Sequence, residues 1–306
     1  MSIYFIIGGA GFIGSHLSEK LFNLGNQVVV LDNFSTGNKK NINEKITFHA
    51  INIDDENELE KVFSKEKPDI VFHLAGVINL RRKIDDPLFE SDLDFLSRTE
   101  KIMKACSKGN VKKIIFISSG GAIYQNATQV PTKESYLAHP SSLYGLANLM
   151  IEKYIEIFCK TKKINYALLR LGNVYGPRQW TTGIIPSLIL SLKNNESPVI
   201  YGDGTQTRDF IYIDDVVEGI IASAGNLENR TYNLGSGKEI SLNQAFKAIG
   251  DLLNIKDIKP IYMEVNEQDT KRSSLNISKI EKETDWHPIV AFEDGLKKTI
   301  DWFKNN

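Results

Sequence analysis

The segment 8–14 reads Gly-Gly-Ala-Gly-Phe-Ile-Gly, which is the residue spacing of a loop that binds a dinucleotide. It lies between an apolar run over residues 3–7, which predicts a strand, and a helix-like run over residues 12–24. Strand, glycine loop and helix in this order are the context that the binding loop needs. Ordinary turns between strands and helices also contain glycine, so the next strand has to decide between the two interpretations.

The three spaced glycines have separate tasks in such a loop. Gly9 allows a tight turn, Gly11 lets the main chain approach a pyrophosphate, and Gly14 lets the helix close on the strand. The helix N-terminus then offers N–H groups and a partial positive charge to the phosphates. The chemistry that these residues predict is binding of a dinucleotide.

A carboxylate ends the next expected strand, over residues 28–32. Asp32 follows Gly14 by 18 residues, where an acid accepts hydrogen bonds from both adenosine ribose hydroxyls. The same charge repels a 2′-phosphate, so NAD is favoured over NADP. A solvated turn aspartate before Asn33 is the alternative. The agreement between loop and carboxylate favours the NAD site.

These residues need a parallel sheet to position them. Strand candidates fall at 46–53, 69–75, 114–119 and 166–171, and helix candidates at 55–65, 88–107 and 143–162. Continuous apolar strands separated by helices predict an α/β fold with a doubly wound parallel sheet of the Rossmann type. We expect an NAD-binding domain over 1–172 and a smaller α/β region that binds substrate over 173–306, packed intimately on the first.

The composition excludes several classes of protein. The chain has 306 residues, a formal net charge of −1 and a pI near 6.5, so no basic field favours nucleic acid as a partner. No apolar run reaches the length of a membrane span and no leader precedes the first strand, so we expect a cytoplasmic protein. Cys106 and Cys159 lack metal or disulfide spacing. We expect structural roles for His16 and His73, and no metal site.

Several strings along the chain resemble one family, the extended short-chain dehydrogenases that modify nucleotide sugars, of the UDP-galactose 4-epimerase type. The strings are GGAGFIGSHL (8–17), LDNFSTG (31–37), FHLAG (72–76), RRKIDDP (81–87), ISSGGAIY (117–124), SSLYG (141–145), LRLGNVYGPRQ (169–179), GDGTQTRDFIYIDDVV (202–217), YNLGSGKEIS (232–241) and DWHPIVAFEDGLKKTIDWF (285–303). They occur in the order that the family has, and the resemblance spans nearly the whole chain.

The resemblance implies a bound NAD that takes hydride from a sugar carbon, usually C4. In epimerases the keto sugar turns over and receives the hydride on its other face. A tyrosine, matched here by Tyr144, removes the hydroxyl proton with help from a serine or threonine. The implied contacts to NAD are Gly8, Gly11, Phe12, Ile13, Gly14, Asp32, Asn33, Ser35, Thr36, Gly37, Asn52, Ile53, Leu74, Ala75, Gly76, Ser118 and Tyr144.

One departure from the family affects the tyrosine. A phenol of reference pKa about 10 is a poor base at pH 7 unless a cation stabilises its phenolate. The family places a lysine four residues after the tyrosine; this chain has Asn148, which can still bind the nicotinamide ribose. Lys153 lies on the opposite side of the helix. Another cation folded in from residues 81–83, a slow or altered enzyme, and an engineered substitution are three explanations that the sequence leaves open.

A second departure lies in the segment 118–124, here called the serine loop. The family's catalytic serine or threonine falls on Gly120, so Ser119, or Ser118, has to supply the hydroxyl if the loop differs by one residue. Both serines could instead merely cap the strand end. Family dehydratases and decarboxylases carry an acid in this loop, and Gly120-Gly121-Ala122 offers none, which argues against both reactions.

On the substrate side the resemblance assigns the nucleotide diphosphate to Asn173, Arg208 and Arg272, and Arg81 is a further candidate for substrate binding. A guanidinium suits this task because it is a permanent cation with a fork of donors. Asn266 replaces the arginine that usually opens the stretch containing Arg272, which weakens or rearranges that clamp; a solvated Arg272 is the alternative.

The leading hypothesis is an NAD-dependent nucleotide-sugar 4-epimerase with Tyr144 as acid and base and Ser119 and Asn148 beside it. A C4 dehydrogenase or ketoreductase with net redox change, and a non-catalytic protein that binds NAD or a nucleotide sugar, are the rivals. The resemblance also implies a homodimer that pairs helices 88–107 and 143–162 in a four-helix bundle.

Overall fold

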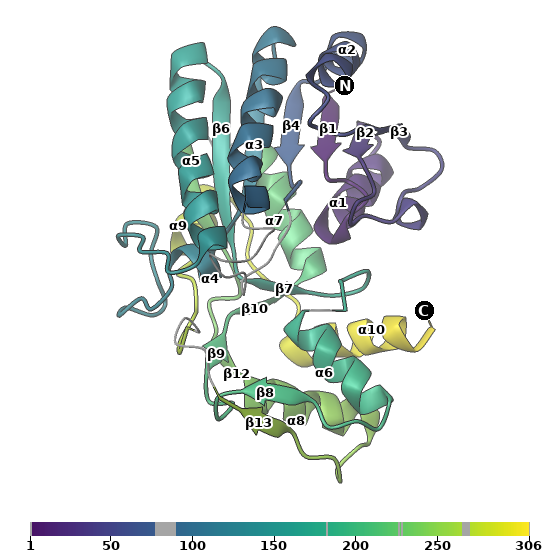
Figure 1. Cartoon of the computed structure of the whole chain (residues 1–306), viewed down its shortest axis with the longest axis vertical. Helices are drawn as coiled ribbons and strands as arrows, with labels where there is room; N and C mark the ends of the chain where they lie inside the picture. Colours follow the sequence, from purple (N-terminus) through teal and green to yellow (C-terminus); the bar gives the residue numbers. More distant parts are fainter. Residues whose placement is uncertain are drawn as a thin grey trace.

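The main sheet of the molecule is a seven-stranded parallel sheet in the order β11-β6-β5-β4-β1-β2-β3. Figure 1 shows β6, β4, β1, β2 and β3 in this order across the sheet. The computed structural model describes residues 2–76, 90–181, 183–225, 227, 229–264 and 270–305. The strands are β1 (Ile3–Ile7), β2 (Gln27–Asp32), β3 (Thr47–Ala50), β4 (Ile70–His73), β5 (Lys113–Ser119), β6 (Asn165–Leu171) and β11 (Arg230–Leu234). The strand order reverses at β1, between β2 and β4, which is where doubly wound sheets bind their ligands.

Helices cover both faces of this sheet, so the predicted doubly wound fold is confirmed. One face carries α2 (Glu56–Glu66), α3 (Glu90–Lys108) and α5 (Leu143–Lys162), which pack side by side. The other face carries α1 (Phe12–Asn23) and α7 (Ile213–Gly225), which also pack on each other (Figure 1).

Each central strand is apolar on both sides because both of its faces are covered. Phe5 and Val29 belong to the core under α2, α3 and α5, whereas Ile6 and Val30 belong to the core on the side of α1. Successive residues of a strand point to opposite faces, so a continuous apolar run supplies two cores at once.

Shorter elements build the region below the carboxyl ends of the strands (Figure 1). Three pairs of strands lie there: β7 (Asn173–Tyr175) with β10 (Phe210–Tyr212), β8 (Val199–Tyr201) with β13 (Ile261–Met263), and β9 (Thr207–Arg208) with β12 (Ile240–Ser241). The remaining helices are η1 (Lys39–Asn41), α4 (Gly120–Ile123), α6 (Ile184–Lys193), α8 (Leu242–Leu253), α9 (Ser278–Glu283) and α10 (Phe292–Asn305).

The chain leaves the main sheet after Leu171 and later returns to it. α7 packs against β5 and β6, and β11 adds the edge strand beside β6. The second half of the chain therefore contributes a helix and a strand to the sheet layer, and it builds the smaller region with its remaining elements.

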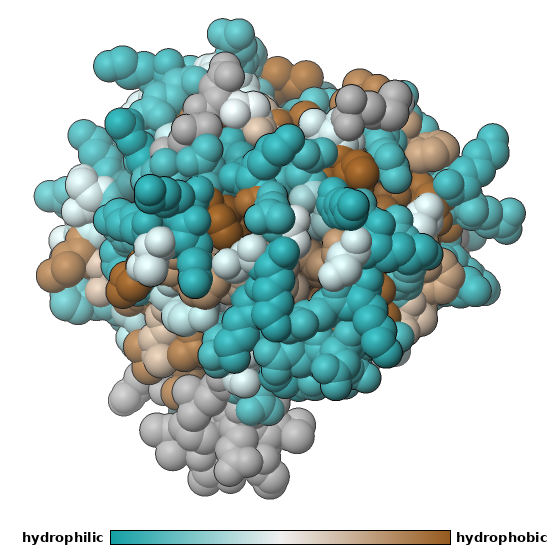
Figure 2. Space-filling model, turned by 90° about the horizontal axis from the view of Figure 1, so that it is seen from above, coloured by the Kyte–Doolittle hydropathy of each residue, from teal (hydrophilic) through white to brown (hydrophobic). Residues whose placement is uncertain are grey.

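The end of the molecule seen in Figure 2 is mostly hydrophilic with scattered apolar side chains.

Candidate active site

The glycine loop folds tightly between β1 and α1. The N–H of Gly8 donates to the carbonyl of Leu31 at 2.8 Å, and Gly8 has a φ of +85°, which favours glycine. A Cβ at Gly14 would overlap the carbonyl oxygen of Gly8, whereas a Cβ at Gly11 would have that oxygen as its nearest neighbour, at 3.3 Å. Gly14 is thus needed for packing, while the side of Gly11 is open toward the place predicted for the pyrophosphate.

The start of α1 is suited to an anion. Gly11 is the N-cap and gives no side-chain cap, and the first turn from Phe12 contains no acidic residue. The first N–H groups of a helix lack partners within the helix, so those of Phe12 and Ile13 are available to donate to an anion. These observations fit a dinucleotide.

Asp32 lies at the carboxyl end of β2 and is tied to the glycine loop. Its carboxylate accepts hydrogen bonds from the N–H of Ala10 at 2.9 Å and from that of Phe34 at 2.8 Å. Gly37 packs against Ala10, where a Cβ would lie 2.7 Å from the Cβ of Ala10. The segment from Asn33 to Gly37 therefore closes over the same end of the loop, with Asn33, Ser35 and Thr36 exposed.

The segment after β4 packs on the glycine loop from the other side. The N–H of Leu74 donates to the carbonyl of Ile7 at 2.9 Å, and a Cβ at Gly8 would lie 2.8 Å from the nitrogen of Ala75. Gly76 follows directly. Asn52 is exposed after β3, where its side chain accepts from the N–H of Asp54, and Ile53 is half-buried. The residues predicted for NAD thus gather around one edge of the sheet.

Tyr144 is the second residue of α5 and is half-buried. The N-cap Ser142 accepts from the N–H of Gly145 and fixes this first turn. A Cβ at Gly145 would overlap the carbonyl oxygen of Ala122, so the helix start lies directly against the serine loop. The fold therefore places the start of the helix that carries Tyr144 beside the loop that contains Ser119.

Asn148 lies one turn further along α5 and is only 1% exposed. Its Nδ2 donates to the carbonyl oxygen of Tyr144 at 2.8 Å. Lys153 is paired with Glu156 on the solvent side of the helix, so it does not replace the family lysine. The segment 81–83, named as another source of a cation, lies outside the described residues, as does Arg81.

Of the two serines in the serine loop, Ser119 is half-buried and Ser118 is buried. The Oγ of Ser119 caps α4 by accepting from the N–H of Ala122 at 3.4 Å. A Cβ at Gly120 would lie 2.7 Å from a methyl group of Leu275, so a serine there would require the Leu275 side chain to shift. The hydroxyl of Ser118 is buried and donates to Glu152 at 2.6 Å, which directs its side chain into the protein.

The residues predicted for the diphosphate lie below the same edge. The Oδ1 of Asn173 is 3.8 Å from the place of a Cβ at Gly121, so Asn173 faces the serine loop. The guanidinium of Arg208 donates to the carbonyl oxygens of Thr207 and Thr270 at 2.8 and 2.7 Å. These two hydrogen bonds hold the guanidinium of Arg208 at the end of β9.

Arg272 differs from Arg208 because it already has an anionic partner. Its Nε and Nη2 donate to the two carboxylate oxygens of Glu239 at 3.0 and 2.5 Å. The hydrogen bond from Arg272 lowers the pKa of Glu239, so both groups are charged at neutral pH. A phosphate role for Arg272 requires exchange of this partner. Asn266 lies outside the described residues.

Asp209 was not predicted and organises this side of the site. It is fully buried, and its carboxylate accepts from the N–H and Oγ of Ser236, from the N–H of Gly237 and from that of Leu275. Burial raises the pKa of Asp209 against the effect of these hydrogen bonds. Its carbonyl oxygen also accepts from the N–H of Asn173 at 2.6 Å. The signal in the sequence is an acid directly before the apolar run 210–213.

The two histidines weighed in the sequence are both largely withdrawn from solvent. Burial lowers the pKa of His73 to about 3, and its Nε2 contacts the hydroxyl of Thr99 at 3.0 Å. Burial also lowers the pKa of His16, whose Nε2 contacts the carbonyl oxygen of Pro177 at 2.9 Å. Among the described residues no group of three or more His, Cys, Asp or Glu side chains could hold a metal ion.

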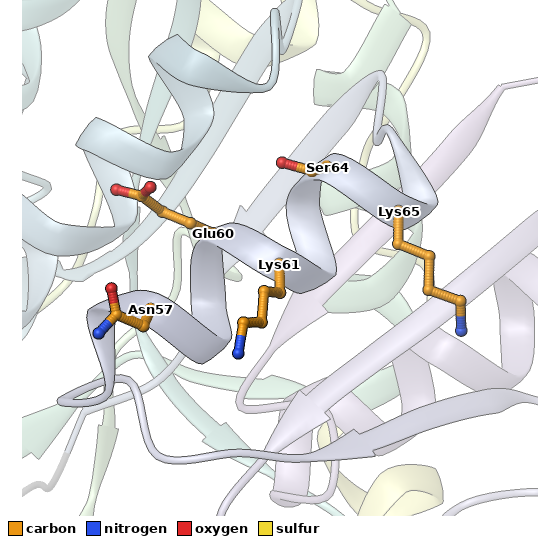
Figure 3. Close-up of a pocket in the computed structure, with 5 residues that line it drawn as sticks. All are labelled: Asn57, Glu60, Lys61, Ser64 and Lys65. Carbon is orange, nitrogen blue, oxygen red and sulfur yellow. The ribbon is translucent and has the colours of Figure 1, made fainter.

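Two further features of the molecule lie outside the predicted site. No helix in the described part of the chain is long and apolar enough to cross a membrane. A surface hollow lies on one helix, α2, and is lined by Asn57, Glu60, Lys61, Ser64 and Lys65 (Figure 3). None of these five residues belongs to the predicted site.

The fold and the site together define a dinucleotide-binding enzyme of the short-chain dehydrogenase class, with a tyrosine and a serine beside the cofactor edge. The model of the NAD dependent epimerase/dehydratase family matches residues 4–235 of the chain. The chain therefore belongs to this NAD-dependent family.

Individual relatives match along their full length. A protein of Methanocaldococcus jannaschii described as a putative UDP-glucose 4-epimerase is 38% identical, over 98% of both chains. The crystal structure of UDP-glucose 4-epimerase from Thermotoga maritima with UDP-glucose has a TM-score of 0.95 and 35% identity, over 99% of both chains. That of Thermus thermophilus UDP-glucose 4-epimerase with NAD has a TM-score of 0.92 and 29% identity, also over 99% of both chains.

Proposed function

We propose that this protein is an NAD-dependent 4-epimerase of a nucleotide-diphosphate sugar. The observation that carries the proposal is the packing of Gly145 on Ala122, which joins Tyr144 and the serine loop at the edge where the glycine loop and Asp32 lie. NAD, when bound there, supplies reversible hydride transfer at the sugar C4. UDP-sugars are the first substrates to test, because the solved relatives act on or bind them.

The chain's own residues then have distinct tasks. Tyr144 takes the proton from the C4 hydroxyl and gives it back, and the hydroxyl of Ser119 donates a hydrogen bond to the same sugar oxygen. Asn173 and Arg208, from the region 173–306, hold the diphosphate so that the sugar alone is free to turn over. The absence of an acid at Gly120, Gly121 and Ala122 argues against proton transfer at neighbouring carbons, as dehydration and decarboxylation require.

Asn148 favours a second candidate, a C4 dehydrogenase or ketoreductase. With no cation one turn after Tyr144, proton removal is weakly assisted, and a slow step in one direction could release the keto sugar. This candidate differs from epimerisation because it leaves NADH behind and needs a second substrate to regenerate NAD.

The two functions separate in one assay. Purified protein is incubated with UDP-, dTDP- and GDP-sugars, and the products are followed by mass spectrometry, by chromatography of isomers and by absorbance near 340 nm. We expect two sugar isomers from one substrate with no net absorbance change. Accumulated NADH identifies the redox enzyme, and a raised melting temperature without any product identifies a binding protein.

We also propose a homodimer through the paired helices α3 and α5. Leu146, Met150 and Ile157 are exposed along α5, by 43%, 38% and 67%, and no element covers them within the described chain. Light scattering of the wild type should give a dimer, and Ile157→Glu should give a monomer.

We place the protein in the cytoplasm, since Cys106 and Cys159 are both buried free thiols.

A further inference from the structure

A buried ion pair links α5 to the main sheet close to the serine loop. Glu152 on α5 and Arg170 on β6 are 1% and 6% exposed. The guanidinium of Arg170 binds both carboxylate oxygens of Glu152, with Nε at 3.0 Å from Oε1 and Nη2 at 2.5 Å from Oε2. This bidentate geometry fixes both side chains.

The same pair holds both ends of the serine loop. The hydroxyl of Ser118, at the start of the loop, donates to the Oε1 of Glu152 at 2.6 Å. The hydroxyl of Tyr124, at the end of the loop, accepts from the Nη1 of Arg170 at 2.6 Å and donates to Asn233 at 3.1 Å. The guanidinium also lies over the Tyr124 ring, 4.9 Å from its centroid. Ser119 lies between these two anchored positions.

Glu152 also shares a helix with the tyrosine. Tyr144, Asn148 and Glu152 follow one another at intervals of four residues, so all three lie toward one side of α5. The carboxylate that anchors the serine loop is therefore fixed relative to Tyr144 by two turns of helix. A shift of the pair would change the distance between the hydroxyls of Ser119 and Tyr144.

We propose that Glu152 and Arg170 are positioning residues, which hold the serine loop in register with the helix that carries Tyr144. The inference rests on the proposed function, because it assigns Ser119 and Tyr144 to one reaction. Buried ion pairs contribute little to stability compared with apolar residues of similar volume. Glu152 and Arg170 bind the side chains of Ser118 and Tyr124, which are the two ends of the serine loop. This arrangement is better explained by the geometry that it imposes on the loop than by stability.

The test removes single anchors without leaving a buried charge. Tyr124→Phe deletes one hydroxyl and keeps the ring, and Ser118→Ala deletes the other anchor. Tyr232→Phe is the matched control, because its hydroxyl donates to Glu283 on α9 and to no residue of the serine loop. All three variants are compared with the wild type for melting temperature, NAD content, kcat, KM for the nucleotide sugar, and hydrogen exchange of a peptide that covers 118–124.

We expect Tyr124→Phe and Ser118→Ala to lower kcat about tenfold, because misplacement by a fraction of an ångström is costly in an active site. KM and NAD content should change less than about twofold, and the loop peptide should exchange faster in both variants. Tyr232→Phe should match the wild type in kcat and in loop exchange. Unchanged kcat and loop exchange in both anchor variants, or an equal effect in the control, overturns the proposal.

The hydrogen-exchange result separates this inference from the proposed function. If the wild type converts no nucleotide sugar, the proposed function fails, while faster loop exchange in the two anchor variants still supports the anchoring itself. If the wild type epimerises its substrate and neither anchor variant changes kcat, the positioning role fails alone. Arg170→Lys supplies a conservative check: it keeps the charge beside Glu152 and loses the fork, so it should lower kcat and speed loop exchange as the two anchor variants do.

Discussion

The side chain of Asn148 donates a hydrogen bond of 2.8 Å to the main-chain carbonyl of Tyr144, one helical turn before it. The amide is buried, so it satisfies one of its donors within α5 and brings no charge to the tyrosine. The proton-transfer end of the site is therefore built around a neutral side chain, where the family to which the chain is similar has a lysine.

Introducing a cation at this position should make the tyrosine a better base. For Asn148→Lys we expect kcat at pH 7 to rise about tenfold and the acidic limb of the pH–kcat profile to move to lower pH, because a nearby cation favours the phenolate. Asn148→Met is the control, with similar length and no charge, and should leave the profile in place. An unchanged profile with lysine means that another group already supplies the charge.

The two glycines of the loop should respond differently to alanine. Gly14→Ala forces a Cβ into the carbonyl oxygen of Gly8, so it should lower the melting temperature as well as NAD content. Gly11→Ala brings its Cβ to 3.3 Å from the carbonyl oxygen of Gly8, so it should lower the melting temperature less than Gly14→Ala does; it should still lose NAD, because its methyl group enters the space of the pyrophosphate. Gly225→Ala, with open space around it, is the control. Full NAD content in Gly11→Ala would contradict the assigned phosphate site.

The two arginines of the substrate side should differ in importance. Arg208→Gln is expected to raise KM for the nucleotide sugar by roughly tenfold to a hundredfold, as the loss of a charged hydrogen bond does. Arg272→Gln should raise KM much less, because Arg272 is already paired with Glu239. Steady-state kinetics with melting temperatures as a folding check decide this. A larger effect at Arg272 would show that substrate displaces Glu239.

His73 should make the folded state sensitive to acid. Burial lowers its pKa to about 3, whereas an unfolded histidine titrates near 6.5, so between these values only the unfolded state binds the proton. The free energy of unfolding should therefore fall as the pH falls below 6.5, by about 1 kcal/mol between pH 6.5 and 5.5 from this residue alone. Urea titrations at pH 6.5 and 5.5 should give a smaller loss for His73→Gln, and an unchanged loss for the exposed His139→Gln. Equal losses in all three proteins would contradict the assignment.

The sequence allowed prediction of the parallel sheet and the cofactor edge because their signals are local. Residues 143–162 were predicted as a helix with the bounds that α5 has, and the acid that ends β2 is joined to the glycine loop. The bounds of α5 follow from the pattern of residues within one segment. The link between Asp32 and the glycine loop follows from the spacing of residues within one strand, loop and helix. The placement of Tyr144 against the serine loop was also predicted, by the resemblance to the family.

The remaining features depend on contacts between distant parts of the chain. Leu275 fills the space beside Gly120, and Asp209 accepts main-chain hydrogen bonds from residues 236, 237 and 275. The pair of Glu152 and Arg170 joins residues 18 positions apart. No periodicity within one element encodes such pairings, so the sequence alone did not predict them. A charged residue within an apolar run, as at Arg170, is the one local signal.

Retention of a label at C4 tests the central claim most directly. Purified protein without added NAD is mixed with a UDP-sugar that carries deuterium at C4, and the products are followed by mass spectrometry, NMR and absorbance near 340 nm. Epimerisation on a bound cofactor predicts two isomers that both keep the deuterium at C4, with no lasting rise in absorbance. Loss of the label from C4, with accumulation of keto sugar and NADH, would contradict it.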